Sequence, residues 1–327
     1  MVSALKSLTI LTQTVVQYKQ WHMNKLFTIL LSIFFASAFG QINMKDSTAQ
    51  VISYWNIGEK QNYIISLQKI KLKESDTTSN EIMTYNVDIT VLDSTEHSYT
   101  IEWFYHNYKT NSTNEIAKKI TSLSEDLKVV IETDEFGVIK GIKNWKEIRD
   151  YMNKTMDTIK NDFENIPNMD KIFEQVKKMY SSKETIESTA IQDVQQFHIF
   201  HGGKYTLGEI LEFNMQGPNI YNPQKPFDIK ATMYLDKINL DENNFIIRLS
   251  QEIDSEQLTN TTFEYLKKMA KTLGTKAPKK EEIGKLTNVT TTDSAIHGTG
   301  WLVYSIQNRI VKTSGVTSIE KRIIEIQ

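Results

Sequence analysis

The pattern of hydrophobic and polar positions divides the chain into two blocks of alternating sequence around one helical stretch. Apolar and polar residues alternate over residues 85–91 and 99–105 in the first block, and over 229–235 and 245–249 in the second. A period of two predicts strands with one buried face. Between the blocks, from Trp145 to Gln196, apolar residues recur every three or four positions, which predicts amphipathic helices. The chain is therefore predicted to be an α+β protein, with a curved antiparallel sheet and helices packed on one face.

Two turn assignments complete the predicted meanders. Asp134-Glu135-Phe136-Gly137 lies between two apolar runs, and its Asp and Gly favour a type I turn closed by a glycine bulge. A second turn is predicted at Gln307-Asn308, before Ile310-Val311. Both blocks then run strand, hairpin, helix, hairpin, which predicts a sheet built from two similar halves. The alternative is that any long antiparallel meander resembles itself at this level.

The N-terminal region has the organisation of a secretory signal peptide. Lys25 precedes an apolar run from Leu26 to Ala36, and Ala38-Phe39-Gly40 supplies small residues for cleavage near Gly40. The apolar run is too short for a comfortable membrane span, so no stable span is expected after cleavage, although an uncleaved anchor is the alternative. We therefore predict a periplasmic or secreted protein.

The predicted organisation has five parts. They are an upstream start extension (1–22), the signal peptide (23–40), a first β-rich half (41–143), a central helical segment (144–197) and a second β-rich half (198–327). Residues 41–49 are polar and are expected to form a disordered lead-in to the first half.

Composition excludes several classes of function. The net charge of the 327 residues is −2, so no basic field indicates a nucleic-acid partner. Cysteine is absent, which excludes disulfides, thiol catalysis and zinc–thiolate sites. Removal of residues 1–40 would take away three lysines and no acidic residue, leaving a mildly acidic protein of net charge −5.

No motif indicates a catalytic, metal or cofactor site. His198 and His201 would share one face of a helix and could then bind a metal, but they would lie on opposite faces of a strand, and no third ligand is evident. The alternative is that the two histidines lie in solvent at the end of a helix and have no binding role. A Gly-x-Ser-x-Gly elbow and a phosphate-binding loop are both absent from the sequence. The protein is therefore predicted not to be an enzyme and to use no cofactor, with an unrecognised hydrolase as the weakest alternative.

Aromatic and methionine side chains are expected to meet between the sheet and the central helices. The candidate ligand-binding residues are Trp103, Tyr105, Trp145, Met152 and Met156. Such side chains adapt to apolar ligands of varied shape. The alternative is that the same residues form an ordinary hydrophobic core.

The order of these features resembles two groups of proteins. The signal peptide, the strand start Gly202-Gly203-Lys204-Tyr205 and the hairpin at Asp134–Gly137 running into Trp145 resemble uncharacterised exported proteins of Bacteroidetes-type bacteria. More distantly, the architecture resembles lipoprotein-carrier half-barrels of the LolA/LppX type, whose curved sheet and covering helices hold acyl chains. The second resemblance concerns the fold alone, and this chain is longer than those carriers.

Together these features predict an exported, non-catalytic protein that binds an apolar small molecule or a lipid. The alternative is a structural or protein-interaction module of the cell envelope, with an envelope protein as partner on the exposed sheet edges.

We expect export to be accompanied by cleavage after Gly40, because the small residues Ala38 and Gly40 end the apolar run. N-terminal sequencing of the protein from its native host checks this, with Gln41 as the first residue. A native protein that begins at Met1 or Met23 would contradict it.

Overall fold

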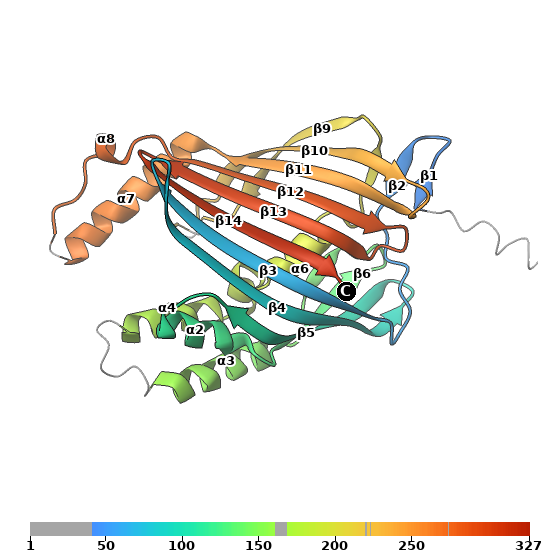
Figure 1. Cartoon of the computed structure of the whole chain (residues 1–327), viewed down its shortest axis with the longest axis horizontal. Coiled ribbons are helices and arrows are strands. Elements are labelled where there is room, and N and C mark those ends of the chain that lie inside the picture. Colours follow the sequence, from blue (N-terminus) through green and yellow to red (C-terminus); the bar gives the residue numbers. More distant parts are fainter. Residues whose placement is uncertain (1–40, 161–168, 220, 223, 274) are drawn as a thin grey trace, which may run out of the picture. The chain divides into compact units, whose positions relative to one another are not determined.

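The alternating segments of both blocks form one eleven-stranded antiparallel sheet. In the computed structural model, which describes residues 41–327 except 161–168, 220, 223 and 274, the strand order is β7-β6-β5-β4-β3-β14-β13-β12-β11-β10-β9 (Figure 1). The first meander comprises β3 (Lys60–Lys73), β4 (Asp76–Thr95), β5 (Ser98–Thr110), β6 (Lys128–Asp134) and β7 (Ile139–Ile142). The second comprises β9 (Ile210–Gly217), β10 (Phe227–Asn239), β11 (Asn244–Ile253), β12 (Thr287–His297), β13 (Leu302–Thr313) and β14 (Val316–Ile326).

Shorter elements surround this sheet. A three-stranded sheet is made by β1 (Ile42–Asn43), β2 (Thr48–Gln50) and β8 (Lys204–Thr206). The helices are α2 (Glu115–Thr121), η1 (Ser122–Ser124), α3 (Trp145–Lys160), α4 (Met169–Met179), α5 (Lys183–Thr185), η3 (Ile186–Ala190), α6 (Gln192–His198), α7 (Ser255–Leu273) and α8 (Lys280–Ile283). No helix in the described ranges has both the length and the apolar character to cross a bilayer. The prediction of an α+β fold with a curved antiparallel sheet is confirmed.

The two meanders join where the first long strand pairs with the last. Strand β3 lies beside β14, from Lys73 opposite Val316 to Tyr63 opposite Ile326. The ladder therefore closes a loop of more than two hundred residues, and the entropy of that closure must be offset by contacts elsewhere in the fold. Every other pairing in the eleven-stranded sheet joins strands that follow one another along the chain, so the β3–β14 pairing alone makes one sheet of two meanders.

One face of the sheet forms the core. Alternate residues of adjacent strands, such as Tyr63, Ile65 and Trp103, are fully buried on this face. Helix α6, which lies behind the sheet in Figure 1, adds Phe197, whose ring centroid is 5.3 Å from that of Trp103 and 5.7 Å from that of Tyr63. Burying one such aromatic side chain contributes roughly 1.5–3 kcal/mol.

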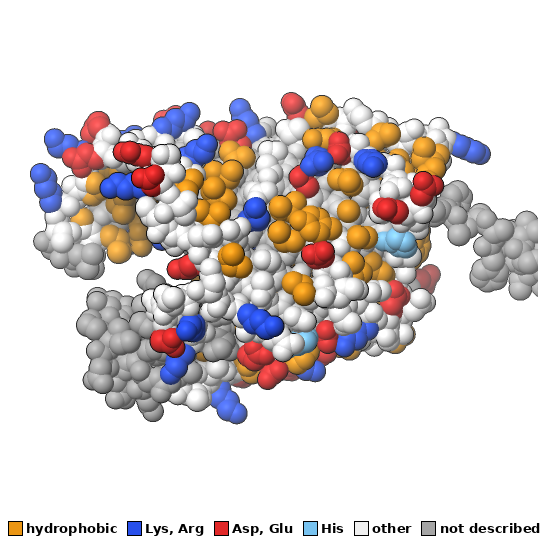
Figure 2. Space-filling view, viewed as in Figure 1, with side chains coloured by type: hydrophobic (Ala, Val, Ile, Leu, Met, Phe, Trp, Pro, Cys, Tyr) orange, Lys and Arg blue, Asp and Glu red, His pale blue; other side chains and the backbone are white. Residues whose placement is uncertain are grey.

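The opposite face of the sheet is turned to solvent and mixes side-chain types. Figure 2 shows charged side chains among apolar patches over these strands. Ile64 and Tyr304, both 36% exposed, belong to this face because their positions alternate with those of the core residues. We call the core side of the sheet the inward face and the solvent side the outward face.

The predicted hairpin at Asp134–Gly137 is confirmed. Strand β6 ends at Asp134 and β7 begins at Ile139. The Asp134 carboxylate accepts hydrogen bonds from the backbone N–H groups of Phe136 (3.0 Å) and Val138 (2.8 Å). Gly137 has a φ of +91°, a left-handed conformation in which a side chain would be strained.

The turn predicted at Gln307-Asn308 is wrong. Strand β13 runs without interruption through both residues, with Gln307 opposite Thr292 and Asn308 opposite Thr291 on β12. The β6–β7 hairpin lies at the edge of the sheet, whereas the proposed equivalent lies inside a central strand. The two hairpins therefore do not occupy equivalent places in the sheet. The alternative fits better: the two halves share only the general pattern of an antiparallel meander.

The disordered lead-in predicted for residues 41–49 is also wrong. Strand β2 pairs with β1 and with β8, and Ala49 is fully buried. Just beyond, the Val51 N–H donates to the Gly203 carbonyl at 2.9 Å, and the Val51 carbonyl accepts from Gly202 at 2.8 Å. These polar residues have no strong local preference for secondary structure, and they are ordered by pairing with a segment distant in the sequence.

Replacing Met156 by alanine is expected to cost about 2–5 kcal/mol of unfolding free energy, because this α3 side chain is 1% exposed and packs in the main core. Chemical denaturation monitored by circular dichroism measures the change. Lys154→Ala, at an exposed position of the same helix, should change the free energy by no more than about 0.5 kcal/mol. Equal effects of the two substitutions would contradict the packing assigned to Met156.

Candidate functional site

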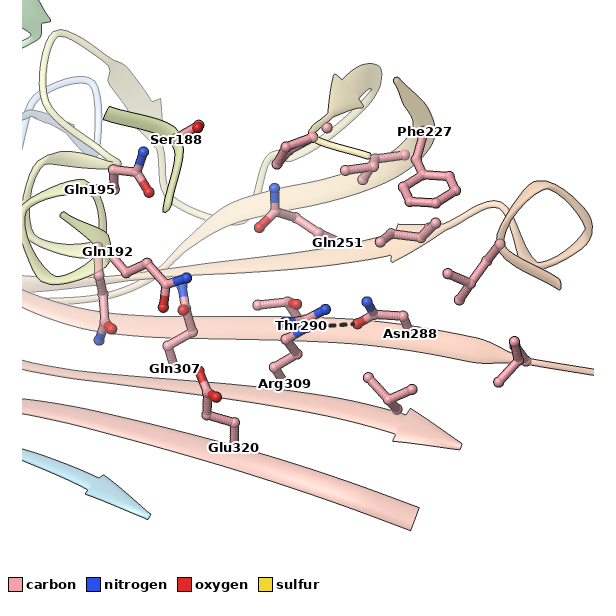
Figure 3. Close-up of a pocket in the computed structure, with 18 of the residues that line it drawn as sticks. Ser188, Gln192, Gln195, Phe227, Gln251, Asn288, Thr290, Gln307, Arg309 and Glu320 are labelled. Atoms are coloured by element: carbon pink, nitrogen blue, oxygen red, sulfur yellow. Dashed lines mark hydrogen bonds between the residues drawn. The ribbon is translucent and has the colours of Figure 1, made fainter. Parts of the chain in front are cut away.

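A cavity of about 540 Å³ lies between the inward face of the second meander and the helical segments beside it. Strands β10 to β14 supply one side, η3 and α6 a second, and α7 closes one end. In Figure 3, Ser188, Gln192 and Gln195 come from the helical side, whereas Thr290 and Arg309 come from the strands. We call this space the sheet–helix cavity.

Polar side chains enter the cavity because they occupy the inward positions of the strands. Gln307 and Arg309 share the inward face of β13 with the buried Ser305. Gln307 donates a hydrogen bond from Nε2 to Thr292 Oγ1 at 3.0 Å, and Ser305 accepts one from Ser294 at 2.8 Å. The inward face of β12 and β13 is thus a hydrogen-bonded polar stripe that leads from the core into the cavity.

The end of the cavity beside α7 is mainly apolar, although Thr262 of α7 and Asn288, which lies opposite Val311, also line it. Phe227, Leu258 and Leu286 form a small buried cluster separate from the main core, and Ile253 packs against it. Val311, two residues beyond Arg309 on β13, lines the same end. The cavity is therefore amphipathic along the strand direction, with polar groups towards α6 and hydrocarbon towards α7.

Beside the cavity, a buried ion pair connects α6 to the sheet. Arg322 Nε on β14 lies 2.9 Å from Asp193 Oδ1 on α6, and the Tyr85 hydroxyl on β4 donates to Asp193 Oδ2 at 2.7 Å. Burial raises the pKa of the Asp193 carboxyl, and the Arg322 charge and the Tyr85 hydrogen bond lower that pKa in part. Gln192 and Gln307, both lining the cavity, accept hydrogen bonds from the same guanidinium.

Two charged residues face the cavity itself, Arg309 and Glu320. Glu320 is held by Arg322, with Nη2 and Oε1 separated by 3.5 Å, and by Lys69 at 3.9 Å. Arg309 donates from Nε to Asn288 Oδ1 at 3.5 Å. Among the described residues, no carboxylate oxygen lies within 4.0 Å of the Arg309 guanidinium.

The two histidines considered from the sequence are buried, so the alternative that they lie in solvent at the end of a helix is wrong. Their ring centroids are 4.9 Å apart, and the rings lie against Trp55. The imidazole of His198 bonds to the Gly137 carbonyl through Nδ1 (2.8 Å), and that of His201 bonds to the Gly300 carbonyl through Nε2 (3.0 Å). Within the described ranges no group of three or more His, Asp or Glu side chains is arranged to hold a metal ion.

The five ligand-binding candidates from the sequence lie in or against the main core. Trp103, Tyr105, Met152 and Met156 are buried, and Trp145 packs against them while partly exposed. None of the five lines the sheet–helix cavity. Their position agrees with the alternative of an ordinary core, and a ligand role for them stays a prediction.

Sequence reasoning missed the polar residues that line the cavity, although a signal was present. On β11, Phe245, Ile247 and Leu249 occupy inward positions, and Gln251 continues the same alternation. A polar residue at a position whose neighbours are buried marks either a bulge or a space that a polar group can enter. On β13 the false turn at Gln307-Asn308 concealed the equivalent signal.

Comparisons with known proteins give a distant likeness in fold. No protein-family model and no curated protein matches the chain. A solved structure, described as showing lipid–protein interactions in lipovitellin, aligns with 83% of this chain at 8% sequence identity and a TM-score of 0.39. This chain spans 25% of that one. A likeness at this level concerns the general arrangement of strands and carries no argument about ligand or activity, and the resemblance to Bacteroidetes-type exported proteins stays a prediction.

The buried histidines should make the protein sensitive to mild acid. Burial lowers the pKa of His201 to about 4 and that of His198 well below its usual value, with the neighbouring His201 adding to the effect on His198. In the unfolded chain these histidines take up protons near pH 6.5, whereas in the folded protein they resist protonation. Their full contribution to the unfolding free energy is therefore present above about pH 6.5 and is lost as the pH drops towards 4. The loss due to His201 is on the order of 3 kcal/mol.

Urea unfolding at a series of pH values measures this loss. In His201→Gln the fall in unfolding free energy between neutral and mildly acidic pH should be smaller than in the parent. His97→Gln, at an exposed turn position, should keep the parent's pH dependence. An unchanged pH dependence in His201→Gln would contradict the role assigned to the buried imidazole.

Proposed function

We propose that this protein is a non-catalytic binding protein that holds an amphipathic, lipid-like molecule in the sheet–helix cavity. The observation that supports the proposal is the cavity of about 540 Å³ whose lining changes from polar to apolar along its length. Cavities for small organic ligands have volumes of about 300–1,000 Å³ and combine apolar walls with a few placed polar groups.

The apolar end supplies the affinity in this proposal. Phe227, Ile253 and Leu286 form a hydrocarbon wall against which a ligand chain would leave water. Each methylene buried contributes about 0.8 kcal/mol, so a chain of roughly eight methylenes gains about 6 kcal/mol before the loss of its own freedom is subtracted. The polar stripe then fixes the orientation of the ligand.

The cellular setting is part of the same proposal. The signal-peptide pattern before Gln41 supports an exported protein that acts in the periplasm or outside the cell. A carrier of a poorly soluble molecule between membrane surfaces, or from the medium to the cell, would need such a cavity and no reactive group.

A second candidate function is protein interaction through the sheet edge. Strand β9 is an edge strand, and its apolar residues Ile210, Leu211 and Phe213 are 62%, 36% and 37% exposed. An exposed apolar edge with unpaired backbone groups favours the addition of a strand from another chain. None of these three residues lines the cavity, so the two candidates can be tested separately.

Filling the cavity should abolish ligand binding. Thr290 lines the cavity on β12, so Thr290→Phe should weaken binding of the uncharged fluorescent probe N-phenylnaphthylamine by at least about tenfold, which corresponds to about 1.4 kcal/mol. Thr291→Phe is the matched control, because Thr291 lies next in the strand on the outward face. Fluorescence titration of the purified protein measures both.

Organic extraction of the native protein followed by mass spectrometry gives independent support if it releases an amphiphile. The proposal is overturned if the parent neither releases such a molecule nor binds the probe. It is also overturned if Thr290→Phe and Thr291→Phe bind the probe as the parent does.

A further inference from the structure

The sheet–helix cavity contains an arginine that differs from the other arginines of the chain. Arg149, Arg248 and Arg322 each lie within 2.9 Å of an aspartate oxygen. Arg309 faces the cavity and, within the part of the chain that the structure describes, has no carboxylate within ion-pairing distance. The side chain of Arg309 is solvent-exposed, and its hydrogen bond to Asn288 uses Nε, so among the described residues its two terminal nitrogens have no hydrogen-bonding protein partner.

The carboxylate opposite Arg309 in the sheet is shared with two other cations. Glu320 stands opposite Arg309 in the β13–β14 register, but it is held by Arg322 and Lys69. Gln192 accepts from Arg322 through its oxygen, so its amide nitrogen is a further donor on the cavity wall. A guanidinium with free terminal nitrogens matches the two oxygens of a carboxylate in a bidentate pair.

The charge near Arg309 selects the kind of anion. One guanidinium faces the cavity while the Glu320 carboxylate lies on the adjacent strand. A single guanidinium can neutralise a monoanion but only half the charge of a dianionic phosphate, and the Glu320 carboxylate repels a dianion more strongly than a monoanion. Neutral amides complete the polar side of the cavity, so the site favours one negative charge.

The position of Arg309 relative to the apolar end fixes the orientation of the ligand. Arg309 is opposite Thr290 on β12, and Leu286 precedes Thr290 by four residues, on the side towards α7. At about 3.3 Å per residue of strand, Leu286 and the apolar cluster around it lie about 13 Å or less from the facing residues Thr290 and Arg309. An alkyl chain of medium length would therefore reach from Arg309 past Val311 to Phe227 and Leu286.

We propose that the ligand is a medium- to long-chain monocarboxylate, whose carboxylate binds Arg309 and whose hydrocarbon chain occupies the apolar end of the sheet–helix cavity. The inference rests on the proposed function, because it requires the cavity to hold an amphiphile. It adds the chemical class of the headgroup, the residue that recognises it and the direction in which the chain lies.

Paired ligands that differ only in their headgroup test the inference. Isothermal titration of the purified protein compares decanoate with decanol, and N-phenylnaphthylamine reports on the cavity independently of charge. The parent should bind decanoate more tightly than decanol by about 10- to 100-fold, the range expected for a charge-assisted hydrogen-bonded pair. Arg309→Gln should remove this preference and leave decanol and probe affinity within about twofold.

Two further variants serve as controls. Arg309→Lys keeps the charge but loses the bidentate geometry, so it should retain part of the preference for decanoate. Arg248→Gln removes an arginine that pairs with Asp236 and Asp293 near the surface and does not line the cavity, so its preference should equal the parent's.

The outcomes distinguish the inference from the function on which it rests. If the parent binds the probe but binds decanoate and decanol equally, the headgroup assignment is overturned and a neutral amphiphile remains. If Arg309→Gln weakens the binding of decanoate, decanol and the probe equally, Arg309 supports the shape of the cavity and the inference is again overturned. If the parent binds none of the three, the proposed function itself fails.

Discussion

The buried ion pair between Asp193 and Arg322 is the constraint on which the rest of the arrangement depends. It joins α6 to β14, the last strand of the second meander, and Tyr85 extends it to β4 in the first. Removing two charges from water is costly, and the pair is tolerated because Tyr85, Gln192 and Gln307 satisfy further hydrogen-bonding positions. The pair therefore fixes the position of α6 even if its net contribution to stability is small, because a displaced α6 would leave both charges buried and unpaired.

Fixing α6 in this way creates a core on one side of the helix and a cavity on the other. Phe197 enters the aromatic core beside Trp103 and Tyr63, where close packing leaves little space. Gln192 and Gln195, on the opposite side of the same helix, face the polar stripe of β12 and β13. Gln196 of the same helix meets the stripe by donating to Ser305 at 2.9 Å, whereas Gln192 and Gln195 line the space that remains between helix and strands.

Local patterning accounts for the parts of the structure that were predicted from the sequence. The hairpin at Asp134–Gly137 was predicted correctly because its turn chemistry is local, and the strands because alternation is local. Gln307-Asn308 was misassigned for the same reason: a polar pair between apolar runs is typical of a turn, but here the inward face is lined by polar side chains and Asn308 points outward. The β3–β14 seam and the burial of His198 and His201 depend on partners distant in sequence, which no local pattern specifies.

One end of the cavity lies beside a small hydrophobic cluster that is separate from the main core. Phe227, Leu258 and Leu286 form a cluster separate from the main core, at the end of the sheet beside α7. A hydrocarbon chain placed there would add apolar contacts to a small cluster, whereas the main core around Trp103 is already closed. Any ligand bound only by the folded state stabilises it in proportion to the logarithm of its concentration over its dissociation constant. Ligand binding and local stability are therefore expected to be coupled at this end of the sheet, whereas the large aromatic residues singled out from the sequence lie in the main core, away from the cavity.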